Sequence, residues 1–254
     1  MAGTIKTPEE LEIIREAGKR LAAVLRECAS AAKSGVTSLE LDALAEKLIR
    51  AGGDVPAFKN YKPAGAKVAF PATLCVSVND AIVHGIPTDT PLKEGDIVGL
   101  DLGLVHKGMY VDAAVTVGVG EIDEAAKRLI ECTKEALAVG IKEARAGKKT
   151  GDIGAPIEEV VDRYGYGTVR ELSGHGVGYA VHEDPFVPNY GKRGEGAMLK
   201  SGMVIAIEPM VNEGGDEIKL GPDKFTFLTK DGSRSAHFEH TVIISDGEPE
   251  VVTK

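Results

Sequence analysis

The chain has 254 residues, of which 43% are hydrophobic, and its formal net charge is −9. This length and apolar content fit one or two globular domains, and the acidic balance argues against a non-specific nucleic-acid binder. No apolar stretch is long enough to span a membrane. Three scattered cysteines exclude a disulfide framework, and the N-terminal region has no secretory signal, so we expect a cytoplasmic protein.

The first half of the chain predicts two helices followed by strands. The sequence TPEE at 7–10 starts a helix that should end near Ala32, and Thr37 starts a second helix that should stop at Gly52. A loop rich in proline and glycine follows. The segment ATLCVSVN and the hairpin IVGLDLGLVHKGMYVDAAVTV then have the apolar patterns of strands.

The second half repeats this order. We expect a long helix over 124–146 and a shorter one over 152–164, and then the strand-like segments MVIAIEPMV, FTFLT and HFEHTVIIS. Moreover, LKEGDIVGLD and LKSGMVIAIE superpose without a gap, and their last residues are Asp101 and Glu208. The pattern predicts a single domain over residues 1–254 with related halves, approximately 7–120 and 121–252.

Acidic residues interrupt four of these apolar strands. Asp101 and Asp112 lie in the first half, and a buried carboxylate is costly unless something compensates its charge. Related halves would bring them close to Glu208 and Glu239 of the second half. Shared protons or bound cations could relieve the repulsion, and His175, which lies between glycines, is a candidate imidazole ligand. Such oxygen and nitrogen donors suit Mn, Fe, Co or Zn.

Each candidate also has a simpler interpretation. Asp101 and Asp112 could face solvent from an edge strand, and His175 could bond to the backbone of a turn. Glu208 could end a strand before a proline, and Glu239 could form a solvated pair with the adjacent histidine. The five residues together favour a metal site, because each simple interpretation would have to hold independently.

Six segments together resemble type I methionine aminopeptidase: SVNDAIVHGIP, GDIVGLDLG, YVDAAVTV, SGHGVGYAVHEDPFVPNY, GMVIAIEPMV and SAHFEHTVII. The resemblance extends from about Thr7 to Val251. It implies an α/β (α+β) pita-bread fold, in which pseudo-twofold duplicated helix–helix–strand halves surround a central curved antiparallel sheet.

The resemblance also implies a pair of divalent metal ions (Co, Mn, Fe or Zn) with a bridging water or hydroxide. Asp112 and Glu239 would bridge the ions, Asp101 would bind one of them, and His175 and Glu208 would bind the other.

By the same resemblance, Glu208, His182 and His84 would be catalytic. The substrate-binding residues would be His84, His182, Phe58, Tyr61, Cys75, Val181 and Phe225. Three positions depart from the family pattern, namely Leu172, Val181 and Phe225, where the family commonly has Met, Phe or Tyr, then Phe, and then Trp. These departures leave the fit of the pocket to methionine less defined than the metal ligands.

The implied function is removal of the N-terminal methionine from nascent proteins when the next residue is small. The partners would be peptides that begin with methionine, with the ribosome as a further candidate, and the protein would act as a monomer without nucleic-acid specificity or membrane attachment. One alternative is a proline-specific aminopeptidase of the same fold. A second is a peptide-binding module without catalytic activity.

Overall fold

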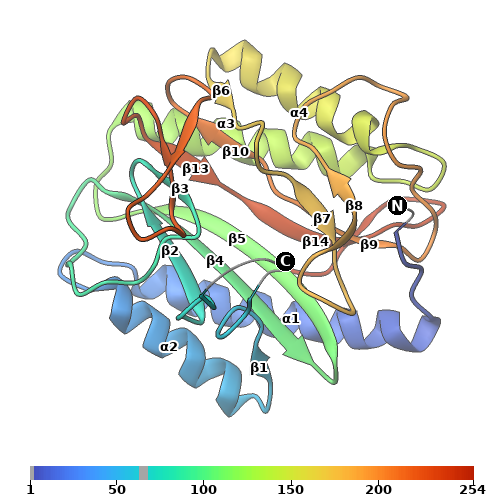
Figure 1. The fold of residues 1–254 in the computed structure, drawn as a ribbon, viewed down its shortest axis with the longest axis horizontal. Coiled ribbons are helices and arrows are strands. Elements are labelled where there is room, and N and C mark those ends of the chain that lie inside the picture. The colour runs from blue at the N-terminus through green and yellow to red at the C-terminus, as the bar shows by residue number, and fades with distance from the viewer. Residues whose placement is uncertain (1–2, 63–67) are drawn as a thin grey trace.

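The computed structural model describes residues 3–62 and 68–254 (Figure 1). Its helices are α1 (Pro8–Ala31), α2 (Ser38–Ala51), α3 (Glu124–Glu143) and α4 (Thr150–Tyr164). The strands are β1 (Val55–Pro56), β2 (Leu74–Val78), β3 (Ala81–Val83), β4 (Ile97–His106), β5 (Met109–Gly118), β6 (Gly167–Thr168), β7 (Gly174–Gly176), β8 (Glu183–Val187), β9 (Val204–Ile207), β10 (Met210–Asn212), β11 (Ile218–Leu220), β12 (Phe227–Thr229), β13 (Ser235–His237), β14 (Glu239–Ile243) and β15 (Glu250–Val251).

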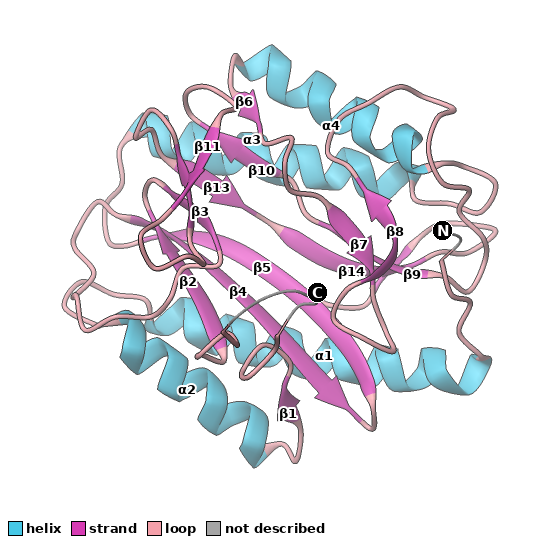
Figure 2. Cartoon of the chain, viewed as in Figure 1, coloured by secondary structure: helices cyan, strands magenta, loops and turns pink. Residues whose placement is uncertain are grey.

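A nine-stranded sheet runs through the centre of the molecule (Figure 2). Its main order is β1–β4–β5–β14–β9–β7–β8, with β2 paired to β4 and β15 paired to β14. Every strand pair of this sheet is antiparallel. The boundary between the first-half and second-half strands lies where β5 meets β14. The expected central antiparallel sheet is therefore confirmed.

Two pairs of helices cover the sheet, with α1 and α2 along one end and α3 and α4 along the other (Figure 1). Each pair buries its apolar stripe in its own core cluster. Leu21 and Leu25 of α1 join residues of β4 and β5, whereas Ile153 and Ile157 of α4 join residues of β9 and β14. No helix among the described residues has both the length and the apolarity needed to cross a membrane.

The predicted helix starts agree with the capping interactions. The Thr7 hydroxyl accepts from the backbone N–H of Glu10, whose carboxylate accepts from the backbone N–H of Thr7, and Thr37 and Glu40 form the same capping box. The expected end of α3 at residue 146 is wrong, because the helix ends at Glu143. The next residues hydrogen-bond to the second-half loops instead, as when the Ala146 N–H donates to the Ser245 carbonyl.

Two strand-like segments of the second half are each divided between two sheets. β9 ends at Ile207 and β10 begins at Met210, and the residues between them include Pro209, which has no N–H to donate to a ladder. β13 and β14 are separated by Phe238 in the same way. β10 and β13 pair with each other in a small sheet with β6, while β9 and β14 remain in the large sheet. Glu208 therefore lies at the break rather than inside a strand.

Candidate metal centre

The strand register brings three of the acidic residues to one place. Ala114 of β5 is the pairing partner of Asp101 on β4 and also of Glu239 on β14. Asp112 precedes Ala114 by two residues, so its side chain lies on the same face of β5. The carboxylates of three neighbouring strands consequently converge on that face of the sheet.

The second half contributes His175 and Glu208. In the pairing of β14 with β9, His240 faces Ile207, so the same register places Glu208 opposite Glu239 just beyond the end of β9. His175 lies on β7, which pairs with the other side of β9. Nε2 of His175 lies 3.4 Å from Oε1 of Glu208. Both side chains thus reach the carboxylates of the first half.

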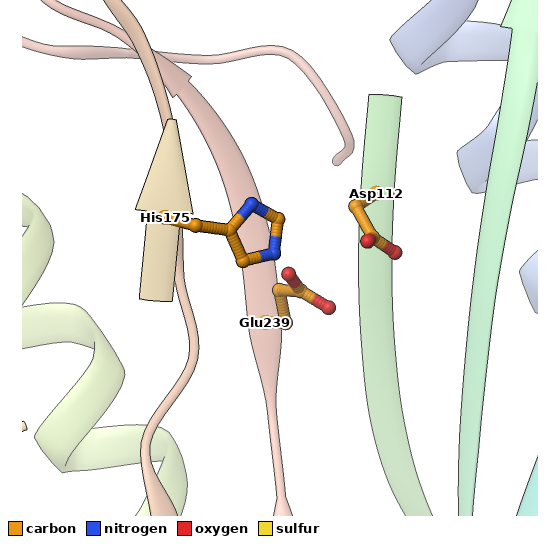
Figure 3. Close-up of side chains that lie close together, drawn as sticks. All are labelled: Asp112, His175 and Glu239. Carbon is orange, nitrogen blue, oxygen red and sulfur yellow. The ribbon is translucent and has the colours of Figure 1, made fainter. Parts of the chain in front are cut away.

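Asp112, His175 and Glu239 form the tightest group, and Figure 3 shows their side chains pointing toward one another from three strands. One ligand atom from each lies within 4.8 Å of the other two. The side chains are buried, because their residues are only 4%, 6% and 2% exposed. The solvent-facing alternatives for Asp112 and Glu239 are therefore wrong.

The ring of His175 has a defined orientation. Its Nδ1 lies 2.9 Å from the Gly176 carbonyl oxygen, to which it donates a hydrogen bond. Backbone bonding of this histidine, which the sequence left open, thus does occur. It leaves Nε2 unprotonated and directed at the carboxylates, because burial lowers the His175 pKa to about 3. A neutral imidazole held through its other nitrogen is the usual form of a metal-binding histidine.

The carboxylates strongly perturb one another. Burial raises the Asp112 pKa to about 7, and it also raises the pKa of Asp101 well above the ordinary value, with the charge of Asp112 adding to the effect. The pKa values of Glu208 and Glu239 rise for the same two reasons, burial first and neighbouring carboxylates second. Four such groups in one site favour either protonation or a bound cation.

The donor set fits divalent metal ions. Oδ1 of Asp101, Oδ1 of Asp112 and Oε1 of Glu239 are buried without a hydrogen-bond partner among the described residues, although buried polar atoms are normally paired. These oxygens and the free Nε2 of His175 are hard and borderline donors of the kind that first-row divalent ions bind. The expected metal-binding site is therefore supported by the side chains themselves.

Two neighbouring side chains fix the backbone of the candidate ligands. The Thr241 hydroxyl accepts from the Asp112 N–H at 2.9 Å and donates to the Asp112 carbonyl at 2.7 Å, which locks β5 to β14. Nδ2 of Asn189 donates to the Glu208 carbonyl at 3.0 Å. Glu208 lies just beyond the end of β9, and this side-chain amide supplies a donor for its carbonyl.

A cavity of about 120 Å³ opens beside the carboxylates. Its lining contains the five candidate ligands together with Phe58, Tyr61, Phe70, Cys75, His84, His182 and Phe225. Val181 does not line it but packs with Phe58 and Cys75 in the apolar cluster behind the wall. The structure thus brings together every site residue predicted from the sequence, with Val181 one layer back.

The two non-ligand histidines lie at the cavity in different ways. His84 has a left-handed backbone with φ of 58°, a strained conformation that is often found at functional sites. Burial, together with the nearby His182, lowers the His84 pKa to about 4. The His182 ring lies 4.4 Å from the His175 ring, centroid to centroid. Nδ1 of His182 lies 2.9 Å from the Tyr61 hydroxyl.

Gly103 shares a face of β4 with Asp101, two residues away. An added Cβ at Gly103 would lie 2.6 Å from Cε1 of Phe58, so the protein itself fills the space that this glycine leaves. Gly103 therefore allows the Phe58 ring to form part of the cavity wall.

Sequence reasoning missed two residues of the site. Phe70 lines the apolar side and makes an edge-to-face contact with Phe225, but its proline-rich and glycine-rich surroundings indicated only a loop. His237 is buried, and its Nε2 lies 3.5 Å from Oε2 of Glu208. Its position two residues before Glu239 was the available signal, since alternate residues of an extended segment share a face.

Comparison with known proteins gives a consistent result. The model of metallopeptidase family M24 matches residues 12–246. A methionine aminopeptidase of Clostridium acetobutylicum is 45% identical over 98% of both chains. The crystal structure of a methionine aminopeptidase from Rickettsia prowazekii is 38% identical and has a TM-score of 0.95, covering 99% of this chain and 100% of that one. A prolidase from Pyrococcus horikoshii is 25% identical with a TM-score of 0.79, and the match covers 98% of this chain but 63% of the prolidase.

Proposed function

The chain belongs to metallopeptidase family M24, and we propose that it is a methionine aminopeptidase that removes the N-terminal methionine of nascent proteins when the next residue is small. The observation that carries this proposal is the pairing of two surfaces in one cavity. Buried carboxylates and an imidazole form one side, and a wall of apolar side chains forms the other. The first could hold metal ions and the second a methionine side chain.

We assign five ligands to a pair of divalent ions: Asp101, Asp112, His175, Glu208 and Glu239. Asp112 and Glu239 would bridge the ions, Asp101 would hold one, and His175 and Glu208 would hold the other. When bound, such ions acidify a coordinated water and polarise the carbonyl of the scissile bond. The unpartnered oxygens of three of these residues support the assignment.

The protein's own groups would move the protons. Glu208 would accept the proton of the attacking water and transfer it toward the leaving amine, because its carboxylate lines the cavity beside the other proposed ligands. The Tyr61 hydroxyl would donate to Nδ1 of His182, leaving the Nε2 proton of His182 free to donate to the carbonyl oxygen. His84 would lie near the scissile nitrogen.

The apolar wall would select the N-terminal side chain. The cavity wall next to the proposed ligands is formed by uncharged side chains, namely Phe58, Phe70, Cys75 and Phe225. An apolar methionine side chain could therefore pack against this wall. Val181 supports this wall from behind. These contacts would give binding energy proportional to the apolar area buried.

The proposal extends to the location, oligomeric state, partners and metal ions of the protein. We propose a cytoplasmic protein that acts as a monomer on peptides beginning with methionine, with the ribosome as a candidate partner, and with Co, Mn, Fe or Zn as the ions. Curated bacterial relatives over nearly the whole chain support the peptide substrate. They do not decide between these metals.

The experiment compares two peptides. Metal-loaded protein should release methionine from Met-Ala-Ser and should leave an Ala-Pro peptide intact, whereas a proline-specific aminopeptidase would do the reverse. Asp112→Ala should abolish the release. If the protein bound either peptide but cleaved neither when loaded with Co, Mn, Fe or Zn in turn, the result would favour the non-catalytic alternative and contradict the proposal.

A further inference from the structure

Lys6 is buried although the proposed reaction does not use it. The residue precedes α1 and is 3% exposed. Its Nζ lies 2.7 Å from Oε2 of Glu183, and it also contacts the Thr4 hydroxyl and the face of the Tyr179 ring. Burying an ion pair costs desolvation free energy, and the attraction between the two charges offsets this cost only when further hydrogen bonds are made. The surroundings of Glu183 supply those bonds.

Glu183 closes the loop that precedes it. Its Oε1 accepts from the backbone N–H groups of Tyr179 and Ala180, so the side chain reaches back across the loop from its end to its start. Its Oε2 faces Lys6 and accepts from the Thr4 hydroxyl. One carboxylate oxygen of Glu183 therefore accepts hydrogen bonds from the loop, and the other accepts them from the N-terminal segment.

The backbone and the side chain of Lys6 are also held in place by contacts outside Glu183. Its backbone N–H donates to the Gly202 carbonyl at 2.9 Å. Its side chain passes over Gly178, where an added Cβ would lie 2.3 Å from Cε of Lys6. The Gly178 carbonyl in turn accepts from the Tyr110 N–H of β5 at 2.7 Å. The start of the loop is thus fixed between Lys6 and the central sheet.

The clamped loop carries two residues of the candidate site. Val181 supports the apolar wall, and His182 directs its ring toward Tyr61 and His175. His182 immediately precedes Glu183 in the chain. Any shift of the Glu183 backbone would therefore change where the His182 ring lies in the cavity.

We infer that the Lys6–Glu183 ion pair is a positioning device for His182, through which the segment before α1 contributes to catalysis. Neither residue lines the cavity, so the pair acts through His182 and not on the substrate. The inference rests on the proposed function for its kinetic consequence. A displacement of about 1 Å of a catalytic group can lower a rate by roughly 100-fold.

The test uses Glu183→Gln, which keeps the shape and an acceptor oxygen but removes the charge that holds Lys6. We expect kcat for Met-Ala-Ser to fall about 10-fold with little change in KM, since His182 would act in the transition state. Lys6→Met should behave alike. The matched control is Arg15→Met, which breaks an ion pair between α1 and Glu250 (2.8 Å) outside the cavity and should leave kcat unchanged.

A His182→Ala background separates positioning from general damage. If the pair acts through His182, Glu183→Gln should lower kcat no further in that background. An equal loss in both backgrounds, or a kcat like that of Arg15→Met, would overturn the inference. If Lys6→Met does not fold, the isosteric Glu183→Gln still decides the matter.

A second readout does not depend on activity. In protein labelled at histidine, the ring resonances of His182 should shift in Glu183→Gln and Lys6→Met but not in Arg15→Met. Unchanged resonances would contradict the inference. Wild-type protein that releases no methionine would contradict the proposed function while the spectra still tested the positioning role.

Discussion

The Tyr61 hydroxyl oxygen lies 2.9 Å from Nδ1 of His182, so a residue of the first-half loop hydrogen-bonds to a second-half histidine. Burial lowers the His182 pKa, which keeps the ring neutral near pH 7. A neutral ring that accepts from Tyr61 at Nδ1 carries its proton on Nε2. The hydroxyl would therefore determine which nitrogen can donate to a substrate.

Tyr61→Phe removes that hydroxyl and keeps the ring. We expect kcat for Met-Ala-Ser to fall about 3- to 10-fold, because part of the His182 population would carry its proton on the wrong nitrogen. Steady-state kinetics with metal-loaded protein measure the effect. In a His182→Ala background the same substitution should change kcat little, and a full additional loss there would show that Tyr61 acts elsewhere.

Some of the molecule is readable from the sequence because the signals are local. Capping boxes at Thr7 and Thr37 fix where α1 and α2 begin, and the apolar pattern of residues 97–117 predicts the hairpin of β4 and β5. The family motifs then identify all five candidate ligands. These features depend on neighbouring residues and on strand period, which a sequence contains directly.

Other features depend on contacts between distant segments. Phe70 contacts the Phe225 ring across the cavity wall, and after α3 the Ala146 N–H bonds to the distant Ser245 carbonyl. Lys6 reaches Glu183 across 177 positions of the chain. No local pattern predicts such pairs, so they could be found only in the folded structure.

Removing one carboxylate should stabilise the metal-free protein. Burial and the charge of Asp112 raise the Asp101 pKa well above its ordinary value, which means that the ionised form is unfavourable in the fold. Asp101→Asn should therefore raise the unfolding free energy in the presence of a chelator by ~1–3 kcal/mol. Activity should fall by several orders of magnitude because a proposed ligand is lost. Urea unfolding and peptide release together check the two effects.

The opposite result would be informative about this site. If Asp101→Asn destabilised the metal-free protein, the carboxylate would be making favourable contacts that the structure does not contain. A suitable control is Asp231→Asn, which removes an exposed carboxylate. Hydrogen bonds from Ser233 and from the Gly215 backbone lower the pKa of Asp231 to about 2. That substitution should lower stability slightly and leave activity unchanged.

The stability of the metal-free protein should fall as pH rises above neutrality. A carboxyl group whose folded pKa is raised binds a proton that the unfolded chain has released, so the fold loses stability as pH rises through the folded pKa. Burial raises the pKa of Asp112 to about 7, so most of its contribution is already lost at neutrality. The pKa values of Asp101, Glu208 and Glu239 are raised well above their ordinary values, and we expect these three carboxyl groups to cause the decline above neutrality. Each pKa unit corresponds to about 1.4 kcal/mol.

The measurement should cover the range from about pH 7 to about pH 8, above the ordinary histidine pKa of about 6.5. Below it, the buried histidines would contribute in the opposite sense, because burial lowers the His175 and His237 pKa values to about 3 and the unfolded chain binds their protons. Urea midpoints in chelator should decline across the window. Saturating Mn²⁺ should abolish the decline, and a slope that metal left unchanged would place its origin outside this site.

Two glycines of β4 differ in the space around them, and only one of them adjoins the wall of the cavity. At Gly103 an added Cβ would lie 2.6 Å from the Phe58 ring, whereas at Gly99, on the same face of β4, the nearest atom would be an ordinary 3.6 Å away. Gly103→Ala should therefore displace Phe58 and raise KM for Met-Ala-Ser by about 10-fold, since a lost apolar contact costs roughly 1–2 kcal/mol. Gly99→Ala should leave KM unchanged. Equal KM values for the two variants would mean that Phe58 does not contact the methionine side chain.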